Sequence, residues 1–343
     1  MNQKLGKASV RPEQPVYILN SGSIVGTKEG QGPLGLLFDT VGEDDMFGCA
    51  TWEEAESSLQ KKAVGLALDK AGLKAGDISF LFAGDLLGQS IATSFGISSF
   101  QIPLLGVYGA CSTCGESMAL GTMSIAGGLA DKVVCVTSSH FASAEKEFRF
   151  PLEYGNQRPL SATWTVTGSG AFVLGGESAW GGRKARARIT GVTVGKIVDY
   201  GLKDSQNMGA CMAPAAMDTI VQNLQDFGRT VEDYDRIVTG DLGYVGQDIL
   251  FDLVQDKGYD IRVKHMDCGM VIFDQKTQDT HAGGSGCGCA AVTLASYILP
   301  KLRKGEWKRV LFVPTGALLS TVSFNEGASV PGIAHGIVLE HVN

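Results

Sequence analysis

The sequence has little proline, no long apolar run and no excess of basic residues. Prolines number 10, and Lys and Arg (29) are outnumbered by Asp and Glu (36). A net charge of −7 argues against a nucleic-acid partner, and no apolar run reaches the ~18 residues of a membrane span. The first residues, MNQKLGKASVRPEQPVYIL, contain no apolar core of a leader sequence, so we expect no signal peptide. The eight cysteines are then expected to be reduced.

Glycine is the residue in excess, with 46 of 343 positions. That is about 13%, against a norm of ~7%. With so little proline, this glycine content indicates tight turns and close backbone contacts, not a flexible linker. The motifs G-x-S-x-G, the Walker loop and H-E-x-x-H are missing from the sequence. The length allows one large domain or two coupled halves.

The chain contains a duplicated unit. Residues 72–86 (GLKAGDISFLFAGDL) and 228–242 (GRTVEDYDRIVTGDL) share Gly, Asp and Gly-Asp-Leu at a constant offset. Each copy follows a segment with helical spacing of apolar residues and ends in a short β-branched or aromatic run that predicts a buried strand. We therefore predict two related halves, residues 1–180 and 181–343. The basic run at 183–188 (RKARAR), beside this boundary, is interpreted as a solvated turn and strand edge.

A second repeat lies downstream of each unit. Cys111 opens an apolar helix that ends near Gly128, and residues 132–137 then predict a strand. In the second half, residues 283–288 open a helix that ends near Gly305, followed by a strand at 309–314. Alternating helices and buried strands predict a parallel or mixed sheet covered by helices. Two such halves would stack into alternating layers of helix and sheet.

Cys111 lies between an apolar strand expected at 102–108 and this helix. A helix N-terminus favours the thiolate, so we expect a lowered pKa and a nucleophile suited to acyl transfer. A small buried residue between strand and helix is the alternative. Cys111-x-x-Cys114 with Cys287-x-Cys289 also leaves a zinc or redox site open, but the second pair lacks the usual two-residue gap. We therefore predict no metal site.

Glycine-rich segments and histidines provide further candidates. Residues 283–286 (GGSG) precede a helix, and their free amides and hydroxyl would form an anion cradle. Residues 168–170 (GSG) are interpreted as a turn before a strand. His140 follows the end of a predicted strand, where ligand-binding sites of α/β proteins are commonly found. His281 lies next to the predicted cradle. Each of the two is alternatively a structural histidine.

These features resemble the thiolase superfamily, whose members have a duplicated five-layer αβαβα fold with a cysteine at the head of a central helix. Over most of the chain the sequence is similar to β-ketoacyl synthases. The cysteine turn corresponds to residues 108–112 (YGACS), their paired-strand glycine signature to 163–174, and their C-terminal glycine loop to 283–320. The resemblance implies the same α/β fold and a homodimer.

More narrowly, the sequence resembles the stage V sporulation protein AD family of spore-forming Bacilli. The resemblance rests on GPLG (32–35), AGDLL (83–87), GACST (109–113), TSSH (137–140), MAPAA (212–216), AGGSGC (282–287) and IAHG (333–336). It implies that the protein binds dipicolinic acid, with or without calcium, and assists its uptake into the developing spore. It also implies membrane proteins of the same operon as partners and a peripheral position on the inner spore membrane.

The sequence departs from the condensing enzymes at one decisive position. Those enzymes place a histidine after the second-half strand, where this chain has Asp241, and their second histidine or asparagine falls near His281. An ionised carboxylate cannot donate a hydrogen bond and would repel a developing anion. We therefore predict a binding site without catalysis, with Cys111 as a vestigial nucleophile; a condensing enzyme that uses Cys111 on acyl-CoA or acyl-carrier protein is the alternative. The predicted ligand-binding residues are Cys111, Ser112, His140, Asp241, Gly284 and Ser285. Arg149 and Arg158 are either carboxylate ligands or surface ion pairs.

Overall fold

The structure is a computed structural model that describes residues 3–147, 157–182 and 185–342. Ten strands follow one hydrogen-bonded path in the order β12-β11-β14-β17-β10-β3-β9-β7-β5-β6. The first-half strands are β3 (Val16–Val25), β5 (Phe80–Gly84), β6 (Leu104–Gly106), β7 (Lys132–Ser139) and β9 (Gly168–Gly175). The second-half strands are β10 (Ala187–Thr193), β11 (Arg236–Thr239), β12 (His265–Asp267), β14 (Arg309–Val313) and β17 (Gly336–Glu340).

The two halves have the same strand order and directions. In the first half β5, β6 and β7 are parallel and β9 is antiparallel to its neighbours β7 and β3. In the second half β11, β12 and β14 are parallel and β17 is antiparallel to β14 and β10. Along this path the halves meet where β3 and β10 form three residue pairs. The short strands β2 (Ser9–Val10) and β8 (Trp164–Thr165) also pair with second-half strands, β10 and β13 (Gly284–Ser285). The predicted mixed sheet and thiolase-like αβαβα class are confirmed, while the division at residue 180 stays a prediction.

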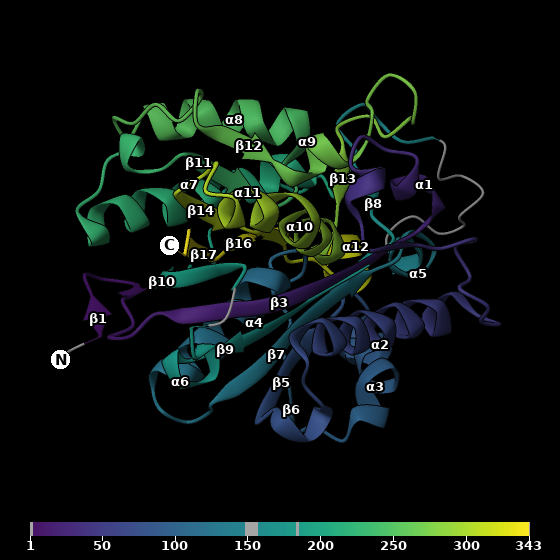
Figure 1. Ribbon diagram of the computed structural model, residues 1–343. Helices are drawn as coiled ribbons and strands as arrows, with labels where there is room; N and C mark the ends of the chain where they lie inside the picture. The colour runs from purple at the N-terminus through teal and green to yellow at the C-terminus, as the bar shows by residue number, and fades with distance from the viewer. Residues whose placement is uncertain (1–2, 148–156, 183–184, 343) are drawn as a thin grey trace.

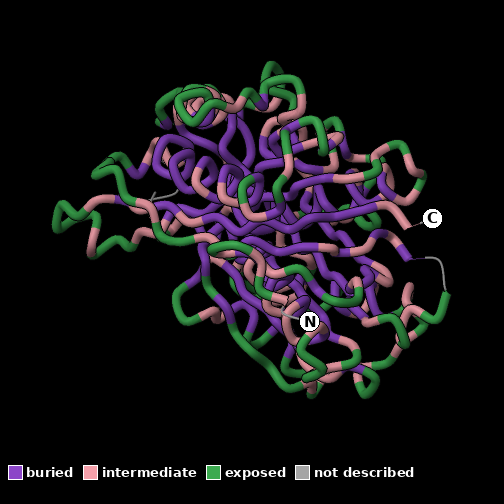
Figure 2. The backbone as a smooth tube through the Cα atoms, turned by 90° about the vertical axis from the view of Figure 1, so that its left-hand side faces the viewer, coloured by how far each residue is buried: buried purple, intermediate pink, exposed green. Residues whose placement is uncertain are grey.

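Helices form the outer and central layers (Figure 1). On the first half, α2 (Trp52–Ala71) and α3 (Ile91–Ile97) form the outer layer; on the second half, α7 (Met208–Phe227) and α8 (Gly243–Gln255) do so. Between the first-half and second-half parts of the sheet lie α4 (Thr113–Ala126), α10 (Cys287–Thr293) and α11 (Leu299–Arg303), with a π-helical turn at Leu294–Ile298. Three buried apolar clusters lie between these layers, one around the central helices and one beneath each outer layer of helices. Figure 2 shows that exposed residues are mostly in the connections.

Shorter elements complete the described chain. The helices are α1 (Thr27–Gly30), α5 (Phe141–Ala144), α6 (Glu177–Trp180), α9 (Cys268–Ile272) and α12 (Thr321–Asn325). The strands are β1 (Lys4–Leu5), β2 (Ser9–Val10), β4 (Thr40–Val41), β8 (Trp164–Thr165), β13 (Gly284–Ser285), β15 (Thr315–Ala317) and β16 (Gly332–Ala334). No helix in the described ranges combines the length and apolar character that crossing a bilayer requires.

The duplicated helix–turn–strand unit is present in both halves. A capping box between Thr51 and Glu54 starts α2, and the side chain of Asn207 caps α7. Both helices end at a glycine in the left-handed region, Gly72 (φ 67°) and Gly228 (φ 60°). A 3₁₀ turn then leads into β5 or β11.

The predicted turn at residues 168–170 is wrong, because these residues begin β9. Their glycines serve the close packing of α10 against this strand. A Cβ atom at Gly170 would lie 2.7 Å from the backbone carbon of Ala291, and one at Gly288 would lie 2.5 Å from the carbonyl oxygen of Gly168. Gly-Ser-Gly therefore marks contact between strand and helix, which a local turn pattern does not distinguish.

Two other predictions need correction or qualification. The strand expected at 102–108 is only three residues long, and its leucines, Leu104 and Leu105, are exposed because β6 is the edge of the sheet.

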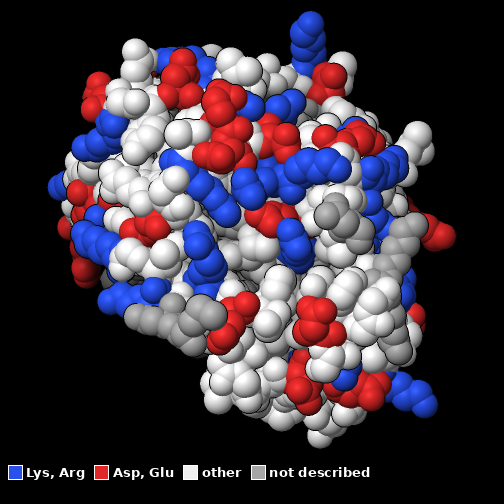
Figure 3. Space-filling model, turned by 60° about the vertical axis from the view of Figure 1, so that its left-hand side comes forward, with Lys and Arg blue, Asp and Glu red and all other residues white. Residues whose placement is uncertain are grey.

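The basic run at 183–188 lies beside the start of β10. Within this run, Arg188 lies in β10 and pairs with Glu340 at 3.1 Å; residues 183 and 184 lie outside the described ranges. Basic side chains gather across the face drawn in Figure 3, with acidic ones among and around them. Charges of both signs thus share this face.

Candidate functional site

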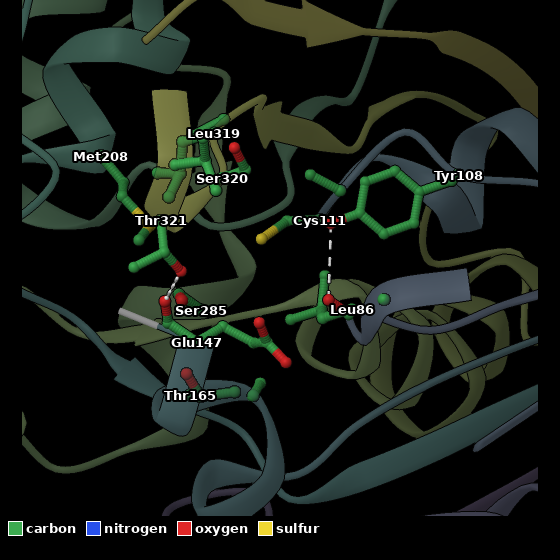
Figure 4. A pocket seen from close by; sticks show the side chains of 15 residues that line it. Leu86, Tyr108, Cys111, Glu147, Thr165, Met208, Ser285, Leu319, Ser320 and Thr321 are labelled. Carbon is green, nitrogen blue, oxygen red and sulfur yellow. Dashed lines mark hydrogen bonds between the residues drawn. The ribbon is translucent and has the colours of Figure 1, made fainter. Parts of the chain in front are cut away.

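A cavity of about 290 Å³ opens beside Cys111, at the end of the sheets where β7 and β14 finish. Both halves of the chain contribute to it, and Figure 4 shows Cys111 between Tyr108 on one side and the segment 319–321 on the other. The wall is mainly apolar, with several hydroxyl groups. The lining residues are Leu86, Gly88, Tyr108, Ala110, Cys111, Ala144, Glu147, Thr165, Met208, Ser285, Ala317, Leu319, Ser320, Thr321 and Val322.

Cys111 is held on a sharp turn between β6 and α4. Ala110, which precedes it, has a φ of 49°, a conformation that costs energy for a residue with a side chain. Hydrogen bonds fix the turn: the Ser112 hydroxyl donates to the Gly109 carbonyl (2.7 Å), and the Thr113 hydroxyl donates to that of Ala110 (2.6 Å). Helix α4 begins only at Thr113, so Cys111 lies just outside its first turn.

The predicted lowering of the Cys111 pKa is wrong. Burial raises the pKa of this thiol well above its ordinary value, and the charge of the adjacent Asp241 raises it further. A hydrogen bond from the Gly286 amide acts in the opposite direction but is the smaller effect. The helix N-terminus therefore does not make Cys111 a thiolate, and the thiol is poorly activated as a nucleophile.

Asp241 binds one of the amides that were expected to bind an external anion, that of Gly286. Its carboxylate accepts a hydrogen bond from the Gly286 amide (2.9 Å), from the Thr315 hydroxyl (2.7 Å), and one from the Cys111 thiol. Burial nevertheless raises the pKa of Asp241 to about 7. The residue is almost completely buried and does not line the cavity. The predicted anion cradle at residues 283–286 is therefore wrong: the Gly286 amide binds a carboxylate of the protein itself, the Gly283 amide donates to the Thr280 carbonyl (3.0 Å), and Gly284 and Ser285 form β13.

The structure brings two of the six predicted ligand-binding residues, Cys111 and Ser285, to the cavity wall. Asp241 lies behind that wall, in contact with Cys111. The Ser112 hydroxyl is used within the cysteine turn. Gly284 forms β13, which pairs with β8, and a Cβ atom there would lie 2.7 Å from the side chain of Ile272. Ser112 and Gly284 therefore shape the site without lining it.

His140 does not face the cavity. Its Nδ1 accepts a hydrogen bond from the Ala142 amide (3.1 Å), so Nε2 carries the proton and donates to the Asp45 carbonyl (2.8 Å). Its ring stacks against Phe141, and burial lowers its pKa. These contacts are those of a structural histidine, which was the alternative to a binding role. None of the five histidines, all within the described ranges, lines the cavity.

The other polar candidates also have partners elsewhere. His281 contacts the Pro159 carbonyl through Nδ1 (2.9 Å) and Asp279 through Nε2 (3.2 Å). Arg158 donates to the Asp279 carbonyl (2.7 Å) and lies over the Trp164 ring. Arg149 lies outside the described residues.

The cysteines form neither a disulfide nor a metal site. The thiol of Cys287 donates to the Ser138 carbonyl, and the eight cysteines, all described, are free of disulfides. Among the described side chains, no group of three or more His, Cys, Asp or Glu is placed to hold a metal ion.

Sequence reasoning missed several residues of the wall. Glu147 and Met208 belong to no motif, and Thr165 was noted only as part of the glycine signature at 163–174. Helix α12 supplies Thr321 and Val322 from the far end of the chain. The Thr321 hydroxyl donates to the Glu147 carbonyl (2.6 Å), across 174 positions of sequence. Only the tertiary fold places these segments together, so no pattern of spacing could have identified them.

Comparison with known proteins gives the fold and the family. Among solved structures, the chain is similar to 3-oxoacyl-[acyl-carrier-protein] synthase III from Aquifex aeolicus VF5 (TM-score 0.58, 12% identity, 95% of this chain and 100% of that chain). It is also similar to human mitochondrial 3-ketoacyl-CoA thiolase in complex with CoA (TM-score 0.60, 14% identity, 97% and 99%). At such identities these likenesses show the thiolase-like fold alone.

A sequence relative is far more similar. Stage V sporulation protein AD of Bacillus subtilis (strain 168) is 44% identical over 335 residues, which cover 98% of this chain and 97% of the relative. Residues 6–340 match the family described as stage V sporulation protein AD. With nearly the whole chain matched and a thiolase-like fold around Cys111, the protein belongs to the stage V sporulation protein AD family of sporulation proteins.

Proposed function

We propose that the protein is a non-catalytic member of the thiolase fold that binds dipicolinic acid, free or as its calcium chelate, and assists its uptake into the developing spore. The observation that carries this proposal is the pairing of Cys111 with Asp241 beside an open cavity. The cavity is retained, while the carboxylate raises the pKa of the thiol and takes up the amide of Gly286. Such a site is suited to binding more than to acyl transfer.

The cavity also suits a small, flat aromatic acid. Its volume of about 290 Å³ is at the lower end for small-molecule pockets. Leu86, Met208 and Leu319 offer apolar contacts to the faces of a pyridine ring, and the hydroxyls of Thr165 and Ser285 are available to its polar edge. A rigid ligand loses little conformational freedom when it binds, which favours a small site.

Calorimetric titration with dipicolinate tests this proposal, with phthalate as the shape-related control. We expect saturable binding of dipicolinate and at least about tenfold weaker binding of phthalate, because one lost hydrogen bond of the ring nitrogen is worth roughly 1.5 kcal/mol. The Ser285→Ala variant should weaken dipicolinate binding by about the same factor. Ser94→Ala, on the exposed part of α3, is the matched control and should bind as the unmodified protein does. Absence of binding at millimolar ligand would contradict the proposal.

A condensing enzyme is the second candidate, and one observation favours it: Cys111 lines the cavity, where a substrate could reach it. The same fold serves condensing enzymes and thiolases among the similar structures. Against it stand the raised pKa of Cys111 and the position of Asp241. Acylation of Cys111 separates the two candidates.

We further propose a homodimer that lies peripherally on the inner spore membrane with membrane proteins of its operon. Support for the dimer is the edge strand β6, whose Leu104 and Leu105 are 42% and 50% exposed and would be covered by a second copy. The membrane partners rest on the family resemblance. Light scattering of the purified protein reports the dimer, and a mass of one chain would contradict it; fractionation of spores reports the location.

A further inference from the structure

Two buried carboxyls, those of Glu56 and Asp85, lie behind the wall of the cavity without lining it. A chain of hydrogen bonds joins them. The Ser138 hydroxyl donates to Glu56 (2.9 Å). The Thr93 hydroxyl donates to Asp85 (2.6 Å), and the Gln60 amide donates to both hydroxyls, at 2.9 and 2.8 Å. In the part of the chain that the structure describes, neither carboxyl is paired with a lysine or an arginine.

Asp85 is the charged member of the pair, because its oxygens accept from donors that cannot reverse. The amides of Leu87 and Thr93 both donate to it, at 2.8 Å. These bonds hold the loop between β5 and α3. In that loop Gln89 (φ 57°) and Ser90 (φ 51°) adopt the left-handed conformation, which is strained for residues with a side chain. Asp85 therefore anchors a strained loop.

Glu56 is the member that holds a proton. Its Oε2 lies 2.5 Å from the Ser143 hydroxyl, which also lies 3.1 Å from the His140 carbonyl. A hydroxyl has one proton, so both contacts are hydrogen bonds only when Glu56 donates and Ser143 donates in turn to the carbonyl. Burial, followed by the charge of Asp85, raises the pKa of Glu56 to about 8. Geometry and burial thus agree on a protonated acid at neutral pH.

The titratable groups around the pair supply no compensating positive charge. They are Glu53, Tyr108, His140 and Cys287. Burial raises the pKa of Tyr108 to about 12 and that of Cys287 well above its ordinary value, and it lowers the pKa of His140, so all three are neutral. Glu53 is exposed and pairs with Lys146 (3.8 Å). An ionised Glu56 would therefore face Asp85 as a second, uncompensated negative charge.

The two carboxyls are bonded to two segments that form one side of the cavity. Asp85 anchors the loop after β5, and Glu56 contacts α5 through Ser143. The wall residues of these segments are Leu86, Gly88, Ala144 and Glu147 (Figure 4). Ionisation of Glu56 would draw the Ser143 proton away from the His140 carbonyl and would repel Asp85. The strained loop is the part that gives way.

Resting on the function proposed above, we infer that Glu56 is a positioning residue of the cavity, whose protonated carboxyl holds the two wall segments together and whose ionisation at alkaline pH loosens them and weakens ligand binding. Glu56 touches no ligand and acts through Ser143 and Asp85. The cavity then holds its ligand at neutral pH and releases it as the pH rises.

Calorimetric titrations of the full chain with dipicolinate at pH 7.5 and pH 9 test the inference. The dissociation constant should rise about eightfold, because the protonated fraction of Glu56 falls from roughly three quarters to roughly one in eleven. Asp241, whose pKa is about 7, is mostly ionised at both values. Glu56→Gln copies the protonated acid, since its amide can donate to Ser143 and its oxygen can accept from Ser138. This variant should bind dipicolinate equally at both pH values.

Glu29→Gln is the matched control. It removes another buried carboxyl, also with a pKa of about 8, that has no contact with the network, and it should keep the eightfold change. Amide hydrogen exchange reports the wall without any ligand. Between pH 7.5 and pH 9 the amides of Leu87 and Thr93 should lose protection, beyond the base-catalysed increase common to all amides. In Glu56→Gln they should keep it.

The outcomes separate this inference from the proposed function. An equal pH dependence in Glu56→Gln and the unmodified protein, or binding that does not change with pH, would overturn the role of Glu56 and leave dipicolinate binding in place. If dipicolinate binds at neither pH, the proposed function fails, and exchange decides the rest. Protection that is lost only when Glu56 is present supports its hold on the wall, whereas protection unaffected by pH overturns it.

Discussion

The Asp241→Asn variant is expected to alkylate at Cys111 about tenfold faster with iodoacetamide at pH 8 than the unmodified protein. The carboxylate of Asp241 contributes to the raised pKa of Cys111, and removing its charge lowers that pKa. Each unit of pKa changes the fraction of thiolate, the reactive form, by about tenfold. Burial, the larger cause, is unchanged, so the thiol should still react more slowly than a free one. Peptide mass spectrometry over time measures the rate.

Cys49 provides the internal control for this experiment. It is partly exposed and lies in a different segment of the first half, before α2. Its alkylation rate should be the same in both proteins. Equal rates at Cys111 in the two proteins would show that Asp241 does not suppress the thiol, and the main argument against a condensing enzyme would be lost.

The Glu29→Gln variant is expected to gain stability relative to the unmodified protein as the pH rises from 5 to 8. Burial raises the pKa of Glu29 from its ordinary 4.5 to about 8, so the folded protein keeps this carboxyl protonated while the unfolded chain releases the proton. The free energy of unfolding therefore falls across this window, and glutamine removes the effect. The gain should reach about 3 kcal/mol, from roughly 1.4 kcal/mol per pH unit.

The local contacts of Glu29 make glutamine a conservative replacement. One carboxyl oxygen accepts a hydrogen bond from the Thr167 amide (2.9 Å), and the other, Oε2, is buried without a hydrogen-bond partner. An amide keeps the acceptor and the shape of the protonated acid. Denaturant titrations at pH 5 and pH 8 measure the difference, with the exposed Glu326→Gln as control. A gain that is the same at both values would mean that Glu29 is ionised in the folded protein.

The duplication and the apolar periodicity predicted much of the fold because they depend on local patterns. The apolar positions that give the segment before the second copy its helical spacing, from Ala213 to Phe227, are all buried in α7. Helices α2 and α7 end where the two copies begin, at Gly72 and Gly228. The glycines at 168–170 were misread, since the same residues suit a turn and a strand on which a helix packs closely. What distinguishes the two is the position of α10, which is more than 100 residues away in sequence.

The site was harder to predict than the fold because its electrostatics depend on contacts between the halves. Asp241 could be placed near Cys111 from the family resemblance, but not its hydrogen bonds to Gly286 and Thr315. The first of those bonds takes up the Gly286 amide, and the strand β13 takes up Gly284 and Ser285, so the expected anion cradle does not form. Burial, which also follows from the fold, reverses the expected direction of the Cys111 pKa. Glu147 had no signal in the sequence at all.

Intact-protein mass spectrometry after incubation with acetyl-CoA tests most directly the claim that this thiolase-like site binds without forming a covalent intermediate. We predict no acyl adduct, because burial and the charge of Asp241 raise the pKa of the Cys111 thiol well above its ordinary value. The Cys111→Ala variant is the control. An acyl group on the unmodified protein that is absent from Cys111→Ala would contradict the account and identify Cys111 as a working nucleophile.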